Sequence, residues 1–218
     1  MKTSSSPNWD YVALVKEYIK PTDKVLDIGT GGGERFLQLA RYYKIGVGTD
    51  SDPEMVEIAV GNAKKVNNTS FLTDTDRLNR LSKDFNVIIN RHAPFNLVAI
   101  KEHLVNHGYF ITQQVGQNNT ANIKKVLGQS NSNPPITKIM IQDASLKTLS
   151  FREYDIDYYV EDIESLVFWL KALDVLHADI EGSKAVGDVD TLNKILKGNV
   201  TDKGFKTNEH RYLVIAQK

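Results

Sequence analysis

The chain has 218 residues, of which 41% are hydrophobic and 25% are charged, as expected for one globular domain. Lys and Arg number 27, as do Asp and Glu, so no overall positive charge attracts nucleic acid. The sequence has no cysteine, which excludes disulfides, thiolate metal sites and cysteine nucleophiles. The polar N-terminus lacks the apolar stretch of a signal peptide, and no apolar run approaches the roughly 18 residues that cross a bilayer. We therefore expect a cytoplasmic protein without a membrane partner.

Strand and helix patterns alternate in the first part of the chain. Residues 1–7 are expected to be disordered, and the amphipathic helix that starts near Trp9 is ended by Pro21. A strand, a helix, a second strand and a second helix are then predicted at 24–29, 34–43, 45–50 and 53–65. This alternation predicts an α/β fold.

A glycine-rich loop follows the first strand of this run. Gly29, Gly31 and Gly33 stand at alternate positions, where they allow a tight turn and a close approach to a ligand. Helical spacing begins at Glu34, so the first amides of that helix point at whatever is bound. The spacing does not fit the Gly-x-Gly-x-x-Gly fingerprint of NAD-binding proteins. The loop therefore indicates a nucleotide-type ligand other than NAD.

Acidic residues follow the next two strands. Asp50 ends the strand at 45–50, where a carboxylate can accept hydrogen bonds from both hydroxyls of a ribose. Its alternative role is to cap the next helix, which starts with the N-cap chemistry of Ser51 and Asp52. A third strand, 69–73, leads to Asp74 and Thr75, which are either ligand contacts or solvated loop residues.

The series Asp27-x-Gly29-x-Gly31-x-Gly33 with these acids resembles motif I of the class I S-adenosylmethionine (SAM) methyltransferases. The resemblance implies an α/β, Rossmann-like fold with a seven-stranded, mostly parallel sheet, an antiparallel last strand and helices on both faces. It implies one domain over residues 1–218, SAM as cofactor and S-adenosylhomocysteine (SAH) as product. In that family the acid at this position helps hold the methionine amino group, the acid after the third strand faces the adenine amino group, and the next backbone amide meets a ring nitrogen. The cofactor-binding residues implied are Asp27, Gly29, Thr30, Gly31, Gly33, Asp50, Ser51, Asp74, Thr75 and Asn90.

Polar side chains end the next two strands, 85–90 and 109–116, at the edge where ligands bind in open parallel sheets. Arg91 and His92 follow the first of them. His92 could act as a general base for a hydroxyl acceptor, or it could have a non-catalytic polar role. Gln113 and Gln114 either contact the acceptor or satisfy backbone groups of a loop. The segment that follows the strand at 85–90 lacks the Asp/Asn-Pro-Pro-aromatic motif of amino-methylating enzymes. This weakens a prediction of adenine or glutamine N-methylation.

A helix over 96–106 is expected to end at Gly108. His103 and His107 would then lie four residues apart on one face of it, a spacing that can bind metal. There is no His-Glu-x-x-His motif, and a histidine near a helix end also suits the helix dipole, so we expect no metal.

Beyond residue 116 the pattern is weaker. A short helix to Leu127 precedes a polar linker over 129–135, and a region over 129–208 is expected to include a cap on the acceptor side. Asp155, Asp157, Tyr158 and Tyr159 either line this cap or pack in ordinary loops. The other predicted elements are a strand at 146–151, a helix at 163–173, a loop-like stretch at 174–187, a helix at 189–197 and a strand at 212–216.

The segments Asn90-Arg91-His92 and Thr112-Gln113-Gln114-Val115-Gly116 resemble a bacterial subgroup of class I methyltransferases with no assigned substrate known to us. The resemblance implies methyl transfer from SAM, and the neutral charge and the apparent cap favour a small-molecule acceptor. Two alternatives stay open. One is an RNA methyltransferase, with a local basic face from Lys64, Lys65, Arg77, Arg80 and Lys83; the other is a SAM-binding module without turnover. The sequence leaves the acceptor and the choice between monomer and homodimer open.

Overall fold

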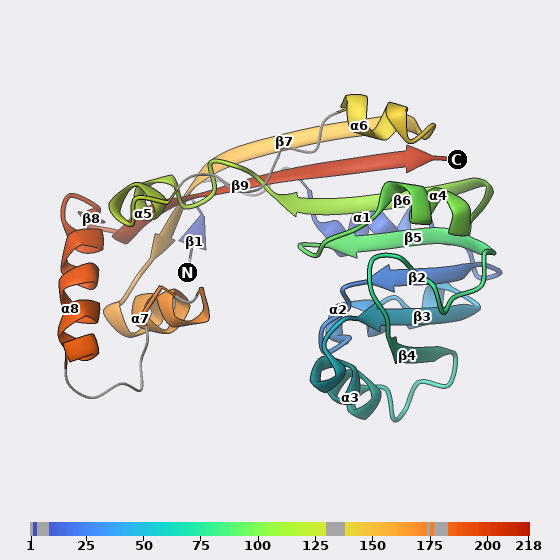
Figure 1. Ribbon diagram of the computed structural model, residues 1–218, viewed down its shortest axis with the longest axis horizontal. Helices are drawn as coiled ribbons and strands as arrows, with labels where there is room; N and C mark the ends of the chain where they lie inside the picture. The colour runs from blue at the N-terminus through green and yellow to red at the C-terminus, as the bar shows by residue number, and fades with distance from the viewer. Residues whose placement is uncertain (1, 4–8, 130–137, 174, 177–182) are drawn as a thin grey trace. The chain divides into compact units, whose positions relative to one another are not determined.

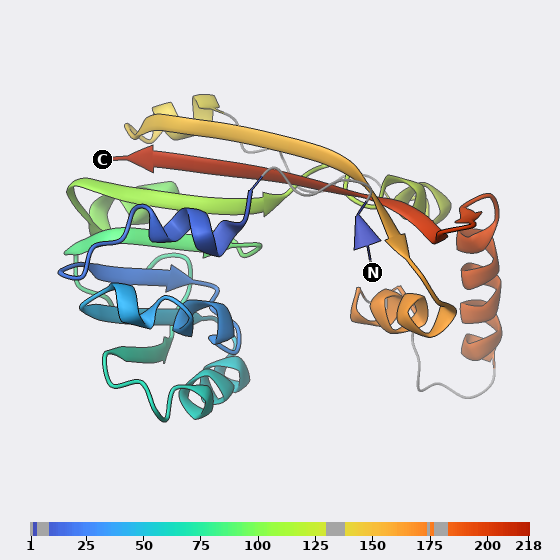
Figure 2. The same ribbon diagram turned by 180° about the vertical axis from the view of Figure 1, so that it is seen from behind.

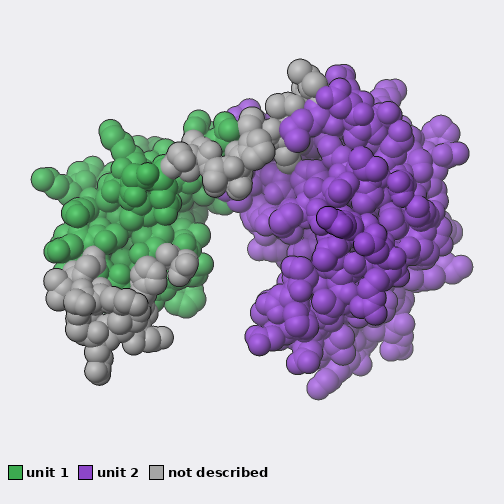
Figure 3. All heavy atoms as spheres, viewed as in Figure 1, with its two compact units in different colours: residues 1–8, 116–135, 154–211 green, residues 9–115, 136–153, 212–218 purple. Residues whose placement is uncertain are grey.

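The computed structural model describes residues 2–3, 9–129, 138–173, 175–176 and 183–218 (Figure 1). The chain divides into two compact units, coloured separately in Figure 3. The large unit comprises residues 9–115, 136–153 and 212–218. The small unit comprises residues 1–8, 116–135 and 154–211.

The strands form one sheet in the order β1-β7-β9-β6-β5-β2-β3-β4, with β8 paired to β9. The pairs β2–β3, β3–β4, β2–β5 and β5–β6 are parallel. The last strand runs against β6, because the amide of His107 donates to the carbonyl of Lys218 while that of Gly116 donates to the carbonyl of His210. The strands are β1 (Lys2–Thr3), β2 (Lys24–Ile28), β3 (Ile45–Asp50), β4 (Thr69–Thr73), β5 (Phe85–Arg91), β6 (Leu104–Val115), β7 (Lys147–Val160), β8 (Val200–Thr201) and β9 (Gly204–Gln217). The mostly parallel sheet with an antiparallel last strand is confirmed, but the sheet has nine strands among the described residues and not the expected seven.

The helices are α1 (Tyr11–Lys16), α2 (Glu34–Leu37), the 3₁₀ turn η1 (Ala40–Tyr42), α3 (Pro53–Asn62), α4 (Leu97–His103), α5 (Ala121–Val126), α6 (Lys138–Asp143), α7 (Ile163–Ala172) and α8 (Ser183–Leu196). In the large unit, α4 lies over the sheet in Figure 1 and α1 lies over the opposite face in Figure 2. Helices therefore cover both faces of the sheet, as expected. Among the described residues, no helix has the length and apolar character needed to cross a membrane.

The large unit has a hydrophobic layer on each face of the sheet. Leu26 and Ile28 of β2 face the layer that contains Ile100 of α4, and Val25 faces the layer that contains Val15 of α1. All five side chains are at most 3% exposed. Burial on both faces explains why the parallel strands are continuous apolar runs and not alternating ones. This core fixes the carboxyl ends of β2, β3 and β5 relative to one another.

The expected helix over 96–106 is wrong in its second half. Helix α4 ends at His103, and β6 begins at Leu104. Gly108 does not stop a helix; a Cβ there would lie 3.0 Å from the carbonyl oxygen of Asn86 on β5, so glycine permits close strand packing. His107 lies in β6, and it therefore does not share a helix face with His103. The helix expected over 34–43 is likewise shorter, divided into α2 and η1.

Four expectations about the rest of the chain also change. Lys2 and Thr3, expected to be disordered, pair with Tyr159 and Tyr158 of β7. The strand expected at 146–151 continues to Val160, so Asp155, Asp157, Tyr158 and Tyr159 lie in β7 and not in a loop. Long-range pairing extends this strand past the point where the local pattern stops indicating one. The final strand is extended in the same way, and α8 begins at Ser183 within the expected loop. The remainder of that loop, except 175–176, and the linker over 130–135 lie outside the described residues.

Candidate functional site

Two cavities lie beyond the carboxyl ends of the parallel strands in the large unit, one of about 180 Å³ and one of about 480 Å³. Gly29, Gly31 and Arg91 line both, so the glycine loop is the wall between them. The smaller cavity is also lined by Tyr11, Val12, Asp27, Thr30, Gly32, Glu34, Arg35, Phe36, Leu39 and Ile89. The larger one is also lined by Ile28, Asp50, Ser51, Asp74, Thr75, Asp76, His92, Ala93 and Pro94.

The glycine loop needs glycine at three positions for conformational reasons. Gly29, Gly31 and Gly33 have φ of +72°, +55° and +78°, in the left-handed region that other residues rarely adopt. At Gly29 a Cβ would lie 2.1 Å from the Cβ of Ala93, and at Gly33 it would lie 2.9 Å from the ring of Phe71. At Gly31 it would meet nothing within 4 Å. Gly29 and Gly33 are therefore closely packed, whereas Gly31 borders open space.

Asp50 links the loop to the end of β3. One carboxylate oxygen accepts a hydrogen bond from the amide of Gly31 at 2.8 Å, and the other accepts one from the amide of Asp52 at 3.0 Å. Each carboxylate oxygen can accept more than one hydrogen bond, so these contacts still leave acceptor capacity. The sequence offered capping of the next helix and ligand binding as alternatives for Asp50. The N-cap of α3 is Asp52, so Asp50 does not cap that helix.

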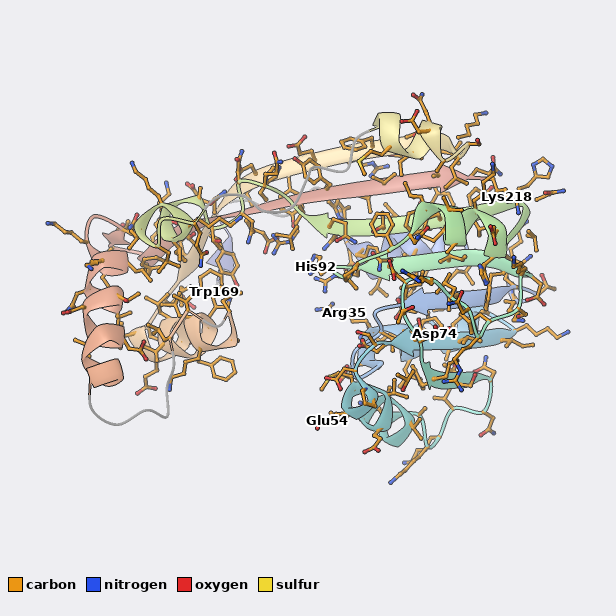
Figure 4. All side chains as sticks on the ribbon, in the orientation of Figure 1. Arg35, Glu54, Asp74, His92, Trp169 and Lys218 are labelled. Carbon is orange, nitrogen blue, oxygen red and sulfur yellow. The ribbon has the colours of Figure 1, made fainter. Side chains whose placement is uncertain are left out.

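Asp74 and Thr75 lie in the larger cavity next to Asp76. The Asp74 side chain, 9% exposed, accepts hydrogen bonds from the amides of Thr75 at 2.8 Å and Arg80 at 3.1 Å. The loop after β4 is therefore folded around the Asp74 carboxylate. The side chain of Asp74 is labelled in Figure 4.

Asp27 is the buried acid of the smaller cavity. Its side chain is 8% exposed, and burial raises the pKa of its carboxyl to about 7, with Asp50 adding to the rise and Arg91 opposing it. Burial likewise raises the pKa of Tyr11, whose hydroxyl donates to the carbonyl of Asn90 at 3.1 Å. A group that ionises near neutral pH in a cavity is a candidate ligand contact.

Two of the predicted cofactor residues, Gly33 and Asn90, line neither cavity. Asn90 is completely buried. Its amide nitrogen donates to the carbonyl of Ile28 at 3.0 Å, and its amide oxygen accepts hydrogen bonds from Thr112 at 3.0 Å and from Gln114. Gln114 also donates to Thr112 and to the carbonyl of Ala93. We call Asn90, Thr112 and Gln114 the amide cluster; it joins β2, β5 and β6 behind the cavity wall.

His92 follows β5 at the rim of the larger cavity, as Figure 4 shows. It has φ of +59°, and its amide donates to the carbonyl of Gln113. Its Nε2 atom lies 3.0 Å from the side-chain nitrogen of Gln113. The side-chain oxygen of Gln113 accepts a hydrogen bond from the indole N–H of Trp9 at 2.8 Å. Gln113 therefore connects Trp9, which precedes α1, to His92 at the cavity rim. Gln113 is 6% exposed.

Sequence reasoning did not assign site roles to several lining residues. Tyr11 and Val12 come from α1, Glu34 and Arg35 from α2, and Asp76 from the loop after β4. For Glu34 and Arg35 the signal was the helix expected to start at Glu34, next to the glycine loop. For Tyr11 and Val12 the one signal was the amphipathic helix expected to start near Trp9.

A metal centre is not found among the residues the structure describes, where no group of three or more His, Asp or Glu side chains could hold an ion. His103 is buried, and its Nδ1 atom lies 2.7 Å from the carbonyl oxygen of Ala99. This hydrogen bond gives His103 a structural role at the end of α4.

Comparison with known proteins identifies the class of this fold. Residues 25–107, which span β2 to the start of β6 and include the glycine loop, match the family model of the methyltransferase domain. The YcgJ protein of Bacillus subtilis has a similar structure, with a TM-score of 0.69 and 18% identity over 95% of this chain and 97% of that one. Residues 25–107 therefore resemble a methyltransferase domain, and the chain as a whole has the Rossmann-like fold of solved methyltransferase structures.

Other structures of this fold differ in activity. A geranyl diphosphate methyltransferase in complex with SAM has a TM-score of 0.58 and 12% identity, over 94% of this chain and 83% of that one. The [4+2]-cyclase SpnF has a TM-score of 0.62 and 16% identity, over 95% and 80%. None of the curated protein sequences matches this chain. Similarity of fold at this identity does not define the reaction, which has to be argued from the site.

Proposed function

We propose that this protein binds SAM across the two cavities and transfers its methyl group to a small molecule. The observation that carries the proposal is the meeting of the cavities at the glycine loop, with Asp27 on one side and Asp50 and Asp74 on the other. SAM has an amino acid end with an ammonium and a carboxylate group and a neutral adenosine end, so it requires different chemistry at its two ends. The methyltransferase domain match over this segment supports the same cofactor.

The smaller cavity suits the amino acid end of SAM. Burial raises the pKa of the Asp27 carboxyl to about 7, so its ionisation costs additional free energy, and a cation bound beside it offsets this cost. The ammonium group of SAM is such a cation. Arg35 and Arg91 line the same cavity and can attract the carboxylate of the methionine portion.

The larger cavity suits the adenosine end. Asp50 and Ser51 provide acceptors for ribose hydroxyls, and Asp74 provides the acid expected near adenine. The amide of Thr75 donates to Asp74, so its proposed contact with a ring nitrogen requires it to share or exchange this hydrogen bond. Gly31, which borders open space, lets the loop backbone approach a ligand that extends through both cavities. Asn90 is proposed to support this wall from behind.

Bound SAM supplies a sulfonium methyl group already activated for in-line displacement. The residues of the chain have to align donor and acceptor and exclude water, because orientation alone can account for much of the barrier reduction. Arg91 and His92, which line the larger cavity, are the proposed acceptor-side residues together with Gln113, whose side chain contacts His92. Gln114, also predicted there, bonds within the amide cluster and is proposed to support this side of the site. The cap predicted over 129–208 remains part of this proposal, as does a cytoplasmic location.

A small molecule is preferred to RNA as the acceptor because the local basic face is partly occupied by internal contacts. Arg80 donates to the carbonyl of Thr73, and Lys83 forms an ion pair with Glu102 at 2.7 Å. The equal number of acidic and basic residues also provides no general attraction for phosphates.

The test is calorimetric titration with SAM, SAH and NAD. We expect saturable binding of SAM and SAH and none of NAD.

Gly31→Ala is the informative variant, because its methyl group would enter the space between the cavities. We expect an affinity loss of at least about tenfold, or ~1.4 kcal/mol. Gly128→Ala is the matched control, since Gly128 also has positive φ (+63°) and open space. Both substitutions strain the backbone by about 1–2 kcal/mol, because alanine rarely adopts a positive φ. Absence of SAM and SAH binding by folded wild type would contradict the proposal.

Turnover separates the remaining alternatives. SAH formation that depends on added small molecules supports the proposed acceptor class. SAH formation that depends on RNA, with strongly salt-dependent RNA binding, would favour an RNA methyltransferase. SAM binding without acceptor-dependent SAH across both sets of acceptors would favour a SAM-binding module.

A further inference from the structure

A chain of hydrogen bonds from Trp9 through Gln113 determines which nitrogen of His92 carries the proton. An indole N–H can donate and cannot accept. The atom of Gln113 that lies 2.8 Å from it is therefore the amide oxygen, and the orientation of the Gln113 amide is fixed. Its NH₂ group then faces Nε2 of His92 at 3.0 Å.

An NH₂ group requires an acceptor, so Nε2 of His92 has to be unprotonated. In a neutral imidazole one nitrogen donates and the other accepts, which places the proton on Nδ1. The imidazolium form has an N–H at both positions and would set Nε2–H against the NH₂ of Gln113. Gln113 is 6% exposed, so reorienting its amide would leave the indole N–H of Trp9 without this acceptor in a poorly hydrated place.

We propose that the Trp9–Gln113 hydrogen bond holds His92 as the neutral Nδ1–H tautomer, and that His92 donates a hydrogen bond to an oxygen atom of the methyl acceptor instead of removing a proton from it. The basic nitrogen, Nε2, is already an acceptor for Gln113, so the general-base role considered from sequence would require this bond to break. Trp9 and Gln113 are positioning residues. The acceptor favoured is a small molecule with a carboxylate or carbonyl oxygen near the methylated atom; this part rests on the proposed function.

The tautomer can be measured in the protein without any ligand. Long-range ¹H–¹⁵N correlation spectra distinguish protonated from unprotonated ring nitrogens, and with five histidines in the chain His92→Gln assigns the signal. We expect Nδ1 to be protonated and Nε2 unprotonated at pH 8. The opposite tautomer in the wild type overturns the proposal, whatever the outcome for SAM binding.

Gln113→Glu reverses the hydrogen-bonding pattern. The introduced carboxylate accepts from both neighbours, so His92 should change to the Nε2–H tautomer and keep its second proton to a higher pH than in the wild type, by about 1–3 units. Identical His92 signals in wild type and variant would contradict the assignment.

Trp9→Phe provides a second variant that adds no buried charge. It keeps an aromatic ring and removes the N–H, so the Gln113 amide is no longer fixed and His92 should become a mixture of tautomers. Trp169→Phe is the matched control, because Trp169 lies in α7 and its ring contacts Tyr158. An unchanged His92 tautomer in Trp9→Phe, or an equal change in both variants, would overturn the role of Trp9.

The ligand class is tested with two small probes in protein saturated with SAH. Acetate should shift the Nδ1 signal of His92 in a saturable way, and methylammonium should not. No response to acetate, or the same response to both probes, would contradict the proposal that His92 donates a hydrogen bond to an oxygen atom of the methyl acceptor. Failure of SAH to bind would contradict the proposed function and leave the ligand-free tautomer measurement valid.

Discussion

The glycine loop and the amide cluster form neighbouring parts of the same site, but they are built in different ways. The loop presents backbone amides and open space, with positive φ at Gly29, Gly31 and Gly33. The amide cluster of Asn90, Thr112 and Gln114 consists of buried or half-buried side chains that hydrogen-bond one another. The first region depends on the absence of side chains, and the second depends on particular ones. Substitutions in the two regions should therefore have different consequences for ligand binding and for folding.

The largest effect is expected at Gly29. In Gly29→Ala the new methyl group would lie 2.1 Å from the Cβ of Ala93 and the residue would also be strained at φ +72°. Overpacking of about 1–3 kcal/mol and left-handed strain of about 1–2 kcal/mol together predict a loss of about 2–5 kcal/mol. Urea unfolding measures it. A loss of less than about 1 kcal/mol would show that the loop adapts more easily than its packing suggests.

The next effect concerns the pH dependence of Asp27. Its folded-state pKa of about 7 lies above the ordinary value of 3.8, so the folded protein binds one more proton than the unfolded chain between these values. The contribution of Asp27 to stability is therefore fully present below about pH 4 and is lost as pH rises to about 7, on the order of 4 kcal/mol in total. The wild type minus Asp27→Asn difference in unfolding free energy should follow this curve; a flat difference would contradict it.

Asp27 should also make SAM affinity depend on pH. The affinity should rise with pH, whereas the contribution of Asp27 to stability falls. Only the ionised carboxylate pairs with the ammonium group, so affinity should fall about tenfold for each pH unit below 7. Calorimetry with SAM measures the fall, and Asp27→Asn should show weak binding without this pH dependence. A pH-independent affinity in the wild type would exclude Asp27 as the partner of the amino group.

Asn90→Ala tests the amide cluster. It removes the partner of the Ile28 carbonyl and of two side chains, and each unsatisfied buried polar group costs about 1–3 kcal/mol, so we expect a loss of at least about 3 kcal/mol. The ratio of SAM to SAH affinity should stay unchanged. Asn96→Ala, which removes the N-cap of α4, is the matched control at about 1 kcal/mol. Equal losses for the two variants would show that the amide cluster is no more than an ordinary polar contact.

The smallest effect is expected at a glycine that the fold does not require. Gly61 lies in α3, and a Cβ there would meet nothing within 4 Å. Gly61→Ala should stabilise the protein by about 0.5–1 kcal/mol and leave SAM affinity unchanged. Thermal unfolding and calorimetry check both results. Destabilisation would mean that Gly61 has a contact or conformation not evident in the fold.

The same contrast explains how much could be predicted from sequence. The loop and the strand-end acids were predictable because their chemistry depends on local spacing, as at Gly29 to Gly33 and Asp50. The connection from Trp9 to Gln113 was not, because those residues are 104 positions apart and meet only when α1 packs beside β6. The end of α4 and the full length of β7 were missed for a similar reason: pairing with distant strands overrode the local helical or loop pattern.

The most direct test of the account is amide hydrogen exchange with and without SAM. We predict increased protection at residues 27–35, 50–52 and 74–77, where the glycine loop and the strand-end acids would contact SAM. Protection at 109–115 should change little, since the amide cluster is already bonded internally. Saturation with SAM that leaves residues 27–35 unprotected would contradict the assignment of the glycine loop as the cofactor site.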